Sequence, residues 1–171
     1  MGSGGTKNLR FKRWPFPNYL ELIQRLARER SDLAVLLFGG PEEQVEHRQI
    51  LQSTAGQRVW APETRNLRQA AALLRRCDSF LSVDTALMHL AAAVKVPRQI
   101  VIEAPTLNAT NVPYRQKYTV VPNPVVNGRN LDYYRYDGRG IQGSDEELIR
   151  CMNSVTVDAV YQAISRVLPA G

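Results

Sequence analysis

The sequence lacks long apolar runs and contains little cysteine. A membrane-spanning helix needs about 18 or more consecutive apolar residues, and no stretch of the 171 residues provides them. The first five residues, Met1 to Gly5, have no apolar core, so they do not resemble a secretory signal peptide. The two cysteines, Cys77 and Cys151, lie far apart and match no metal-ligand spacing. We therefore expect a cytoplasmic protein without a metal, a cofactor or a disulfide.

The sequence has fewer acidic than basic residues: 16 Asp and Glu against 22 Lys and Arg, which gives a net charge of +6. This excess suits a phosphate-bearing ligand, an anionic membrane surface or nucleic acid, and does not choose among them. Basic residues are concentrated only between Lys7 and Arg13, beside Trp14. A basic surface that docks on anionic lipid or nucleic acid therefore stays open as a weaker alternative. Because the chain has no nucleic-acid-binding motif and no run of aromatic residues, we expect no nucleic-acid partner.

Helical periodicity alternates with short apolar runs along the chain, a pattern typical of an α/β fold with a parallel sheet. In such sheets, helices flank strands that are buried on both faces. The predicted helices span 17–30, 41–54, 67–74 (capped by Asn66), 85–94, 145–152 and 157–168. The predicted strands span 33–38, 58–60, 78–83, 99–102 and 117–121.

The length fits one domain over residues 1–171. Within it we expect residues 1–5 to be a disordered or artificially appended tail. Residues 122–143 are rich in Asn, Gly, Arg and Tyr without a clear period, and predict a long loop. Residues 144–168 predict the closing helices.

Ligands of parallel sheets bind beyond the carboxyl ends of the strands, which points to residues 39–43, 84–89 and 103–108. The strongest of these is the turn at Asp84, where a buried strand passes into a helix almost without a loop. Asp84 is expected to cap that helix, so that the next backbone N–H groups and the helix dipole form an anion site suited to a diphosphate. Thr85 adds a hydroxyl, and His89 lies one turn further on the same face.

The residues around this turn, Ser-Val-Asp-Thr-Ala-Leu-Met-His-Leu-Ala-Ala-Ala at 82–93, are similar to a signature of glycosyltransferase family 9, the heptosyltransferases. That signature reads Asp-Thr/Ser-Gly-x-x-His-x-Ala-Ala. Four further segments resemble family elements in the same order, so that the resemblance extends from about Gly5 to Thr106. They are Lys12–Pro15, Leu36–Glu43, Asn66–Leu74 and Ala104–Thr106.

The resemblance implies the C-terminal, donor-binding half of a GT-B glycosyltransferase, in which two Rossmann-like domains face each other across a cleft. The donor would be a nucleotide-diphosphate sugar, with ADP-heptose the first choice, and the enzyme an inverting one that builds lipopolysaccharide or a related glycan. A separate N-terminal domain would hold the acceptor glycolipid and supply the catalytic base, so no catalytic residue is expected here. The enzyme would be bacterial, metal-independent and cytoplasmic, with peripheral contact to the anionic inner membrane. The donor-binding residues carried over are Lys12, Glu42, Glu43, Asp84, Thr85, Ala86 and His89.

Simpler explanations exist for single residues when each is taken alone. Lys12 equally fits a solvated basic segment, and Glu42 and Glu43 fit the first turn of any helix. Trp14-Pro15 is expected to be a packing and helix-start element. We further expect His47 on the surface and Cys77 in the core.

Three departures from the family pattern weigh on the function. Ala86 stands where the family has Gly, and Glu103-Ala104 replaces its Gly before Pro-Thr. The buried first strand of the family domain has no counterpart in residues 1–6, so we expect a fragment whose sheet has an open edge near its middle, with self-association as a consequence. The alternative function is a non-catalytic GT-B-like domain that has lost donor binding.

Overall fold

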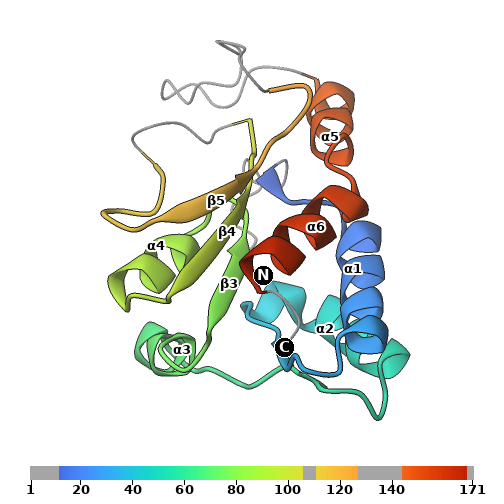
Figure 1. The fold of residues 1–171 in the computed structure, drawn as a ribbon. Helices are drawn as coiled ribbons and strands as arrows, with labels where there is room; N and C mark the ends of the chain where they lie inside the picture. Colours follow the sequence, from blue (N-terminus) through green and yellow to red (C-terminus); the bar gives the residue numbers. More distant parts are fainter. Residues whose placement is uncertain (1–11, 106–110, 127–143, 169–171) are drawn as a thin grey trace.

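The structure is a computed structural model that describes residues 12–105, 111–126 and 144–168 (Figure 1). Helices and strands alternate along the first two of these ranges, and two helices fill the third. The elements are α1 (Phe16–Glu29), β1 (Val35–Leu36), the 3₁₀ turn η2 (Pro41–Glu43), α2 (Gln44–Ser53), β2 (Val59–Trp60), α3 (Leu67–Leu74), β3 (Ser79–Ser82), α4 (Ala86–Ala93), β4 (Arg98–Ile102), β5 (Tyr118–Val121), α5 (Asp145–Asn153) and α6 (Val157–Val167). The predicted order of elements is confirmed throughout these ranges.

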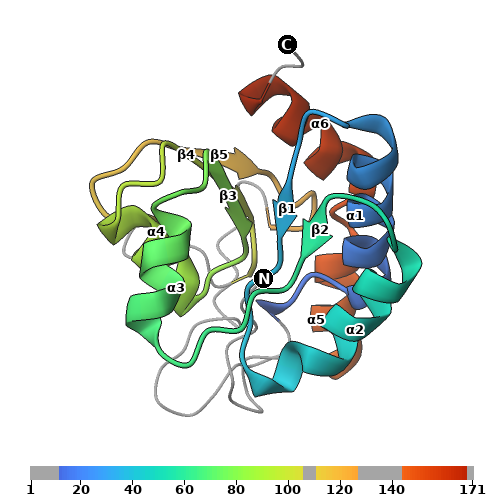
Figure 2. The same ribbon diagram turned by 90° about the horizontal axis from the view of Figure 1, so that it is seen from below.

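The strands form two parallel sheets. One contains β1 and β2, and the other has the order β3-β4-β5. Val35 of β1 lies opposite Val59 of β2, whereas β3 and β4 pair from Ser79 opposite Arg98 onward. Figure 2 shows β1 beside β3 and β2 on the other side of β1, and β5 is an outer strand of the three-stranded sheet. Parallel strands with flanking helices confirm the predicted fold class.

Strand β4 is buried on both faces, as its continuous apolar run predicts, whereas β1 is half-buried and Trp60 of β2 and Val120 of β5 are exposed. Leu36 and Phe38 pack toward α3 and α4, where the Phe38 ring meets the edge of the Phe80 ring at a centroid distance of 6.1 Å. The alternate side chains Val35 and Leu37 pack with Ile23 and Ile50 of α1 and α2. A one-residue alternation thus assigns each side chain of β1 to one of two helix layers.

Trp14 fixes the start of α1 to the largest core cluster. Its side chain is fully buried, its ring meets Tyr19 edge-on at 5.0 Å, and its Nε1 donates to the carbonyl of Val155 at 2.8 Å. Pro15 is the residue that precedes the first turn of α1. The expectation that Trp14-Pro15 is a packing and helix-start element is confirmed.

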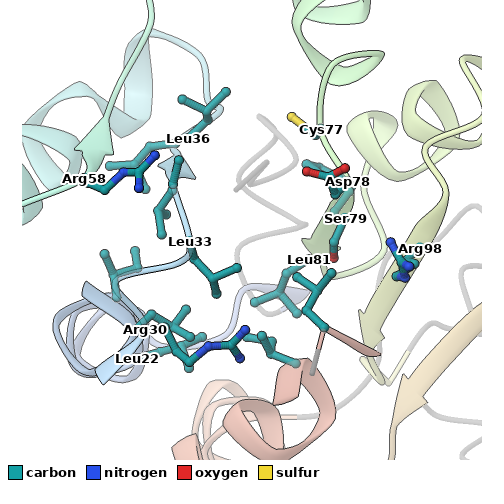
Figure 3. A pocket seen from close by; sticks show the side chains of 18 of the residues that line it. Leu22, Arg30, Leu33, Leu36, Arg58, Cys77, Asp78, Ser79, Leu81 and Arg98 are labelled. Carbon is teal, nitrogen blue, oxygen red and sulfur yellow. The ribbon is translucent and has the colours of Figure 1, made fainter. Parts of the chain in front are cut away.

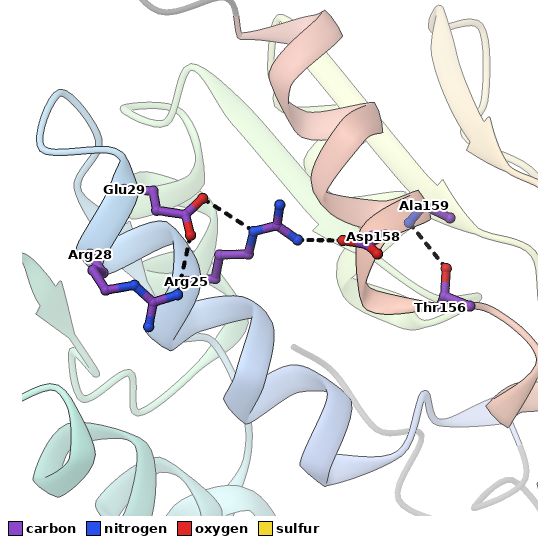
Figure 4. Close-up of polar contacts among 6 residues, drawn as sticks. All are labelled: Arg25, Arg28, Glu29, Thr156, Asp158 and Ala159. Atoms are coloured by element: carbon purple, nitrogen blue, oxygen red, sulfur yellow. Dashed lines mark hydrogen bonds and ion pairs between the residues drawn. The ribbon is translucent and has the colours of Figure 1, made fainter.

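Helices α1 and α6 are joined at the surface by Arg25 (Figure 4). Its guanidinium donates to Asp158 of α6 and to Glu29 of its own helix, and it stacks on the ring of Tyr161 at 3.9 Å. The neighbouring Arg28 and Arg25 hold the pKa of Glu29 below its usual range. Because these groups are exposed, the contacts align the helices more than they stabilise them.

The first strand is shorter than the predicted 33–38. Only Val35 and Leu36 form the ladder, with bonds from Val35 N to Arg58 O and from Leu37 N to Trp60 O, both 2.8 Å. The reason is that β1 has a strand on one side only, and this strand is itself two residues long. The open edge expected near the middle of the sheet is therefore confirmed, between β1 and β3.

Two single-residue expectations need correction. His47 is not on the surface but 8% exposed, because α2 turns it toward Gly39 at the end of the first strand. Cys77 is half-buried at the margin of the core rather than inside it, and its Sγ donates to Leu73 O.

Part of the predicted loop at 122–143 and the tail at 1–5 lie outside the described residues. In the described part of the chain, no helix is both long and apolar enough to cross a bilayer.

Candidate functional site

The turn after β3 holds an ion pair between residues far apart in sequence. Lys12 Nζ lies 2.6 Å from Asp84 Oδ2, and the two side chains are only 17% and 7% exposed. Both were predicted from sequence to flank a diphosphate, and the structure brings them into contact. Moving two charges out of water is costly, and this cost is recovered only by good geometry and further hydrogen bonds.

Asn111 supplies one of these further hydrogen bonds. Its Nδ2 donates to the same Asp84 oxygen at 3.0 Å. Asn111 was missed from the sequence because it lies outside any periodic element, between β4 and β5. The only available signal was its position in a segment that follows the carboxyl end of a strand.

Arg13 connects this site to the helix that follows the first strand. It forms an ion pair with Glu46, in the first turn of α2, while the preceding Lys12 binds Asp84. Helix α2 follows β1 and Asp84 follows β3. Two consecutive basic residues therefore bind the segments after both strands, and the carboxyl ends of β1 and β3 lie at one edge of the molecule.

The helix after β3 begins one residue later than predicted. Thr85, not Asp84, is the N-cap of α4, and its Oγ1 accepts from Met88 N at 3.4 Å. Asp84 does not cap the helix because its carboxylate is engaged by Lys12 and Asn111. The Thr85 hydroxyl thus accepts from the amide of Met88, whereas the amides of Ala86 and Leu87 have no acceptor within the helix.

Two predicted site residues line the accessible side of this helix. Ala86 opens α4 and is exposed, so its methyl group lies at the start of the helix, where the first amides have no acceptor within the helix. His89 is also exposed, one turn further along. An anion placed at the start of α4 would meet two backbone donors and the favourable end of the helix dipole.

The two predicted glutamates have different roles in the structure. Glu43 is 2% exposed, and its Oε2 accepts from Gly40 N at 2.7 Å. A Cβ at Gly39 would lie 2.8 Å from Glu43 Cβ, so only glycine permits this close approach. Glu42 is exposed in the same turn. Glu43 therefore shapes the loop after β1, whereas Glu42 presents its carboxylate to solvent.

Glu103 was expected to add negative charge near the site, and the structure gives it a structural partner. Its Oε2 accepts from Asn123 N at 2.7 Å. Asn123 is fully buried and donates its Nδ2 to the carbonyls of Glu103 and Cys151, while its Oδ1 accepts from Ser154 Oγ. Glu103 thus ties the end of β4 to the segment that leads to α5 and α6. None of this network was evident from the sequence.

Residues 12–105, 111–126 and 144–168 hold no group of three or more acidic, histidine or cysteine side chains that could bind a metal ion.

Comparisons with known proteins identify the family. The sequence profile of glycosyltransferase family 9 (heptosyltransferase) matches residues 3–134. The chain belongs to glycosyltransferase family 9. It is 29% identical over 163 residues to lipooligosaccharide heptosyltransferase 2 of Haemophilus ducreyi, a match that covers 92% of this chain and 44% of the relative. It is 36% identical over 91 residues to lipopolysaccharide heptosyltransferase 2 of Salmonella typhimurium, covering 50% and 25%.

A solved structure of the family has the same fold. The E. coli ADP-heptose lipopolysaccharide heptosyltransferase II superposes with a TM-score of 0.65 at 25% identity, covering 98% of this chain and 45% of that protein. The chain thus spans less than half the length of the curated relatives it matches. Its sheet and helices correspond to part of a family 9 enzyme.

Proposed function

We propose that this chain is the donor-binding part of an inverting glycosyltransferase that takes a nucleotide-diphosphate sugar, ADP-heptose first among them. The observation that carries the proposal is the Lys12–Asp84 contact at the end of β3, which brings a lysine to the segment just before α4, a helix whose first amides have no acceptor within the helix. A diphosphate is the ligand whose charge and size suit this arrangement. The printed names of the relatives, heptosyltransferases that include an ADP-heptose enzyme, support the choice of sugar and nucleotide.

The proposed chemistry is displacement at the anomeric carbon of the donor sugar. An acceptor hydroxyl attacks that carbon and loses its proton to a base, while the bond to the diphosphate oxygen breaks and its electron pair leaves with the nucleoside diphosphate. Negative charge therefore grows on the diphosphate as the bond breaks. Lys12 and the amides of Ala86 and Leu87 would stabilise that charge, with Thr85 and His89 as further contacts. The base would come from an acceptor-binding domain.

The ribose of the nucleotide would lie near the loop after β1. A carboxylate there can accept hydrogen bonds from both ribose hydroxyls. Glu42 has the exposed carboxylate, and Glu43 has the one held beside Gly40. Separate Gln substitutions of the two glutamates would assign the contact, because only the variant that loses it binds ADP more weakly than the natural chain while its affinity for adenine alone stays unchanged.

The acceptor would be a glycolipid of the lipopolysaccharide core, placed at the inner face of the cytoplasmic membrane. The excess of 22 basic over 16 acidic residues supports weak peripheral contact with anionic lipid. The relatives' names support the acceptor class, since they are lipooligosaccharide and lipopolysaccharide enzymes.

Titration calorimetry with ADP, UDP and GDP tests the donor-binding proposal on the chain as it stands. We expect heat of binding with ADP and a weaker or undetectable signal with the other two. Absence of heat with all three nucleotides would contradict the proposal.

A second candidate is a family 9 domain that no longer binds a donor, favoured by the exposed methyl of Ala86 before the free amides. Ala86→Gly separates the two candidates. If the domain binds donor, removing the methyl leaves ADP affinity equal or higher. If the domain has lost donor binding, the natural chain does not bind ADP. Binding by the glycine variant alone would then assign the loss to the methyl group, and no binding by either protein would assign it to other residues.

A further inference from the structure

The net positive charge of the chain is concentrated where its strands begin. The first residue of each strand, taken with the five residues before it, gives the segments 30–35, 54–59, 74–79, 93–98 and 113–118. These five segments hold eight of the 22 basic residues and two of the 16 acidic residues, so 14 of each kind remain in the rest of the sequence. The excess of +6 is therefore the charge of these segments, which we call the basic edge.

The segments of the basic edge lie together in the folded chain. The strands within each sheet are parallel, so their first residues share one end of that sheet. The starts of β1 to β4 border a single pocket, around which Figure 3 shows Arg30, Arg58 and Arg98. The start of β5 adjoins that of β4, because Gln99 lies opposite Tyr118. The basic edge is thus a continuous surface at the end of the sheets opposite to Asp84.

Most basic side chains of this edge have no acidic partner. Arg30 is the exception, with Nη2 at 2.6 Å from the carboxylate of Asp32, and Arg58 donates to the carbonyl of Ser31. The second acidic residue of the edge, Asp78, is exposed and forms no ion pair with a described residue. The remaining basic residues are all exposed and likewise form no ion pair within the described part of the chain. They are Arg75, Arg76, Lys95, Arg98, Arg115 and Lys117.

Two of these charges are held side by side by the strand register. Because Gln99 is paired with Tyr118, the preceding residues Arg98 and Lys117 lie at the same level of neighbouring strands, which are about 4.8 Å apart. Like charges at such a separation repel each other. The negative dipole ends of α3 and α4 offset the first basic residue after each helix, but they leave Arg98 and Lys117 uncompensated. A row of repelling cations of this kind indicates an anionic partner.

An exposed aromatic ring beside these cations indicates which anionic partner fits. Tyr114 is 71% exposed, and the guanidinium of Arg115 lies 5.2 Å from the centroid of its ring. Tyrosine combines an apolar ring with a polar tip and is enriched at the interface between bilayer and water. The apolar stems of Lys and Arg side chains suit the same interface, because their charged ends stay at the headgroups. Single-stranded nucleic acid is typically bound on several stacked aromatic residues, so one tyrosine among many cations favours anionic lipid.

We propose that the basic edge docks on the headgroups of an anionic lipid bilayer, with the ring of Tyr114 at the interface. The inference rests on the peripheral lipid contact of the proposed function and goes beyond it by naming the surface that makes the contact. It also defines an orientation on the membrane. The donor site proposed at the carboxyl ends of the strands faces away from the lipid, toward the water from which a nucleotide sugar would come.

Co-sedimentation with vesicles tests the proposal on two matched double variants, each checked for unchanged thermal unfolding. Arg98→Gln with Lys117→Gln removes two charges of the basic edge, and Arg48→Gln with Arg68→Gln removes two exposed charges of α2 and α3 outside it. The vesicles are phosphatidylcholine, with and without one third of phosphatidylglycerol. We expect the natural chain to bind only the anionic vesicles, less tightly as salt rises. The edge variant should bind about 10–30-fold more weakly, because each basic residue near such a surface contributes about fivefold, and the control variant should stay within about twofold of the natural chain.

Equal losses in the two double variants, or no binding of the natural chain to anionic vesicles, would overturn the proposal. Tyr114→Trp reports on the interface: its emission should shift to the blue with anionic vesicles, beyond any shift of the natural chain. Polyuridylate that binds the natural chain as tightly as the vesicles do at the same salt would contradict a lipid surface.

Titration with ADP separates this inference from the donor-binding proposal. The edge variant should bind ADP as the natural chain does, because the basic edge lies at the other end of the strands. Vesicle binding without ADP binding would contradict the donor site alone, whereas ADP binding without vesicle binding would overturn the docking surface alone.

Discussion

Lys12 and Asp84, 72 positions apart in the sequence, meet at 2.6 Å at the start of α4, with Asn111 as a third partner. The contact ties the segment before α1 to the end of β3. It also places a cation where the proposed diphosphate would develop charge. The same pair therefore has a structural role and a proposed functional role, and the two can be measured separately.

The structural role predicts strong thermodynamic coupling between the two side chains. Lys12→Met removes the charged partner of the buried Asp84 carboxylate, at a cost of about 3 kcal/mol. In a double-mutant cycle with Asp84→Asn, measured by urea unfolding, the coupling energy should be about 1–3 kcal/mol. The exposed Arg28–Glu29 pair is the control and should show no measurable coupling. Equal coupling in both pairs would contradict the account of the site.

The role of Trp14 predicts a large difference between the two tryptophans of the chain. Trp14→Phe removes the hydrogen bond to Val155 and leaves a gap in the core, so the free energy of unfolding should fall by about 2–4 kcal/mol. Trp60 is 49% exposed, and Trp60→Phe should change it by less than about 0.5 kcal/mol. A similar effect of both substitutions in denaturant titrations would show that Trp14 does not anchor α1.

The burial of His47 predicts a pH dependence of stability. Burial lowers the pKa of its imidazole, and its Nε2 is buried without a hydrogen-bond partner in the described structure. Because the unfolded chain takes up a proton near pH 6.5 and the folded chain does so only at lower pH, this contribution is fully present above that value. The stabilising contribution of the neutral His47 is lost as the pH falls from that value through the lower pKa of the folded chain.

The two histidines of the chain allow a matched measurement of this effect. The unfolding free energy of the natural chain should fall between pH 7 and 5. His47→Asn should flatten the profile in this window, whereas His89→Asn, at an exposed position, should leave it unchanged. A profile that is equally steep in the His47 variant would rule out His47 as its source.

The open edges of β1 and β3 predict weak self-association of the chain, because unpaired strands near the middle of a sheet invite pairing. Size-exclusion chromatography with light scattering should show a mass that rises with protein concentration. A clean monomer at every concentration would contradict this prediction.

The sequence predicted the order and type of the elements well, because apolar periodicity reports directly which face of an element is buried. It also brought Lys12 and Asp84 to the same site, through a family resemblance rather than through spacing. It could not predict that Thr85 replaces Asp84 as the helix cap, because the competitors for the Asp84 carboxylate come from distant segments.

The same limit applies to Asn111, Asn123 and His47. Asn111 and Asn123 act through long-range hydrogen bonds that leave no local pattern. His47 lies in a polar stretch, and its burial depends on how close α2 comes to Gly39. The separation of Glu42 from Glu43 follows from the bond to Gly40 N, which only the folded loop defines.

The measurement that tests the central claim most directly is calorimetric titration of ADP into the natural chain, Lys12→Ala and Lys117→Ala, each checked to be folded at the assay temperature. Lys117 is an exposed lysine near the start of β5 and controls for the loss of one charge. We predict that the natural chain and Lys117→Ala bind ADP equally and that Lys12→Ala binds about 10–100-fold more weakly, as expected for a lost charged hydrogen bond. Equal affinity of all three proteins, or no binding by the natural chain, would contradict the assignment of a donor site to the start of α4.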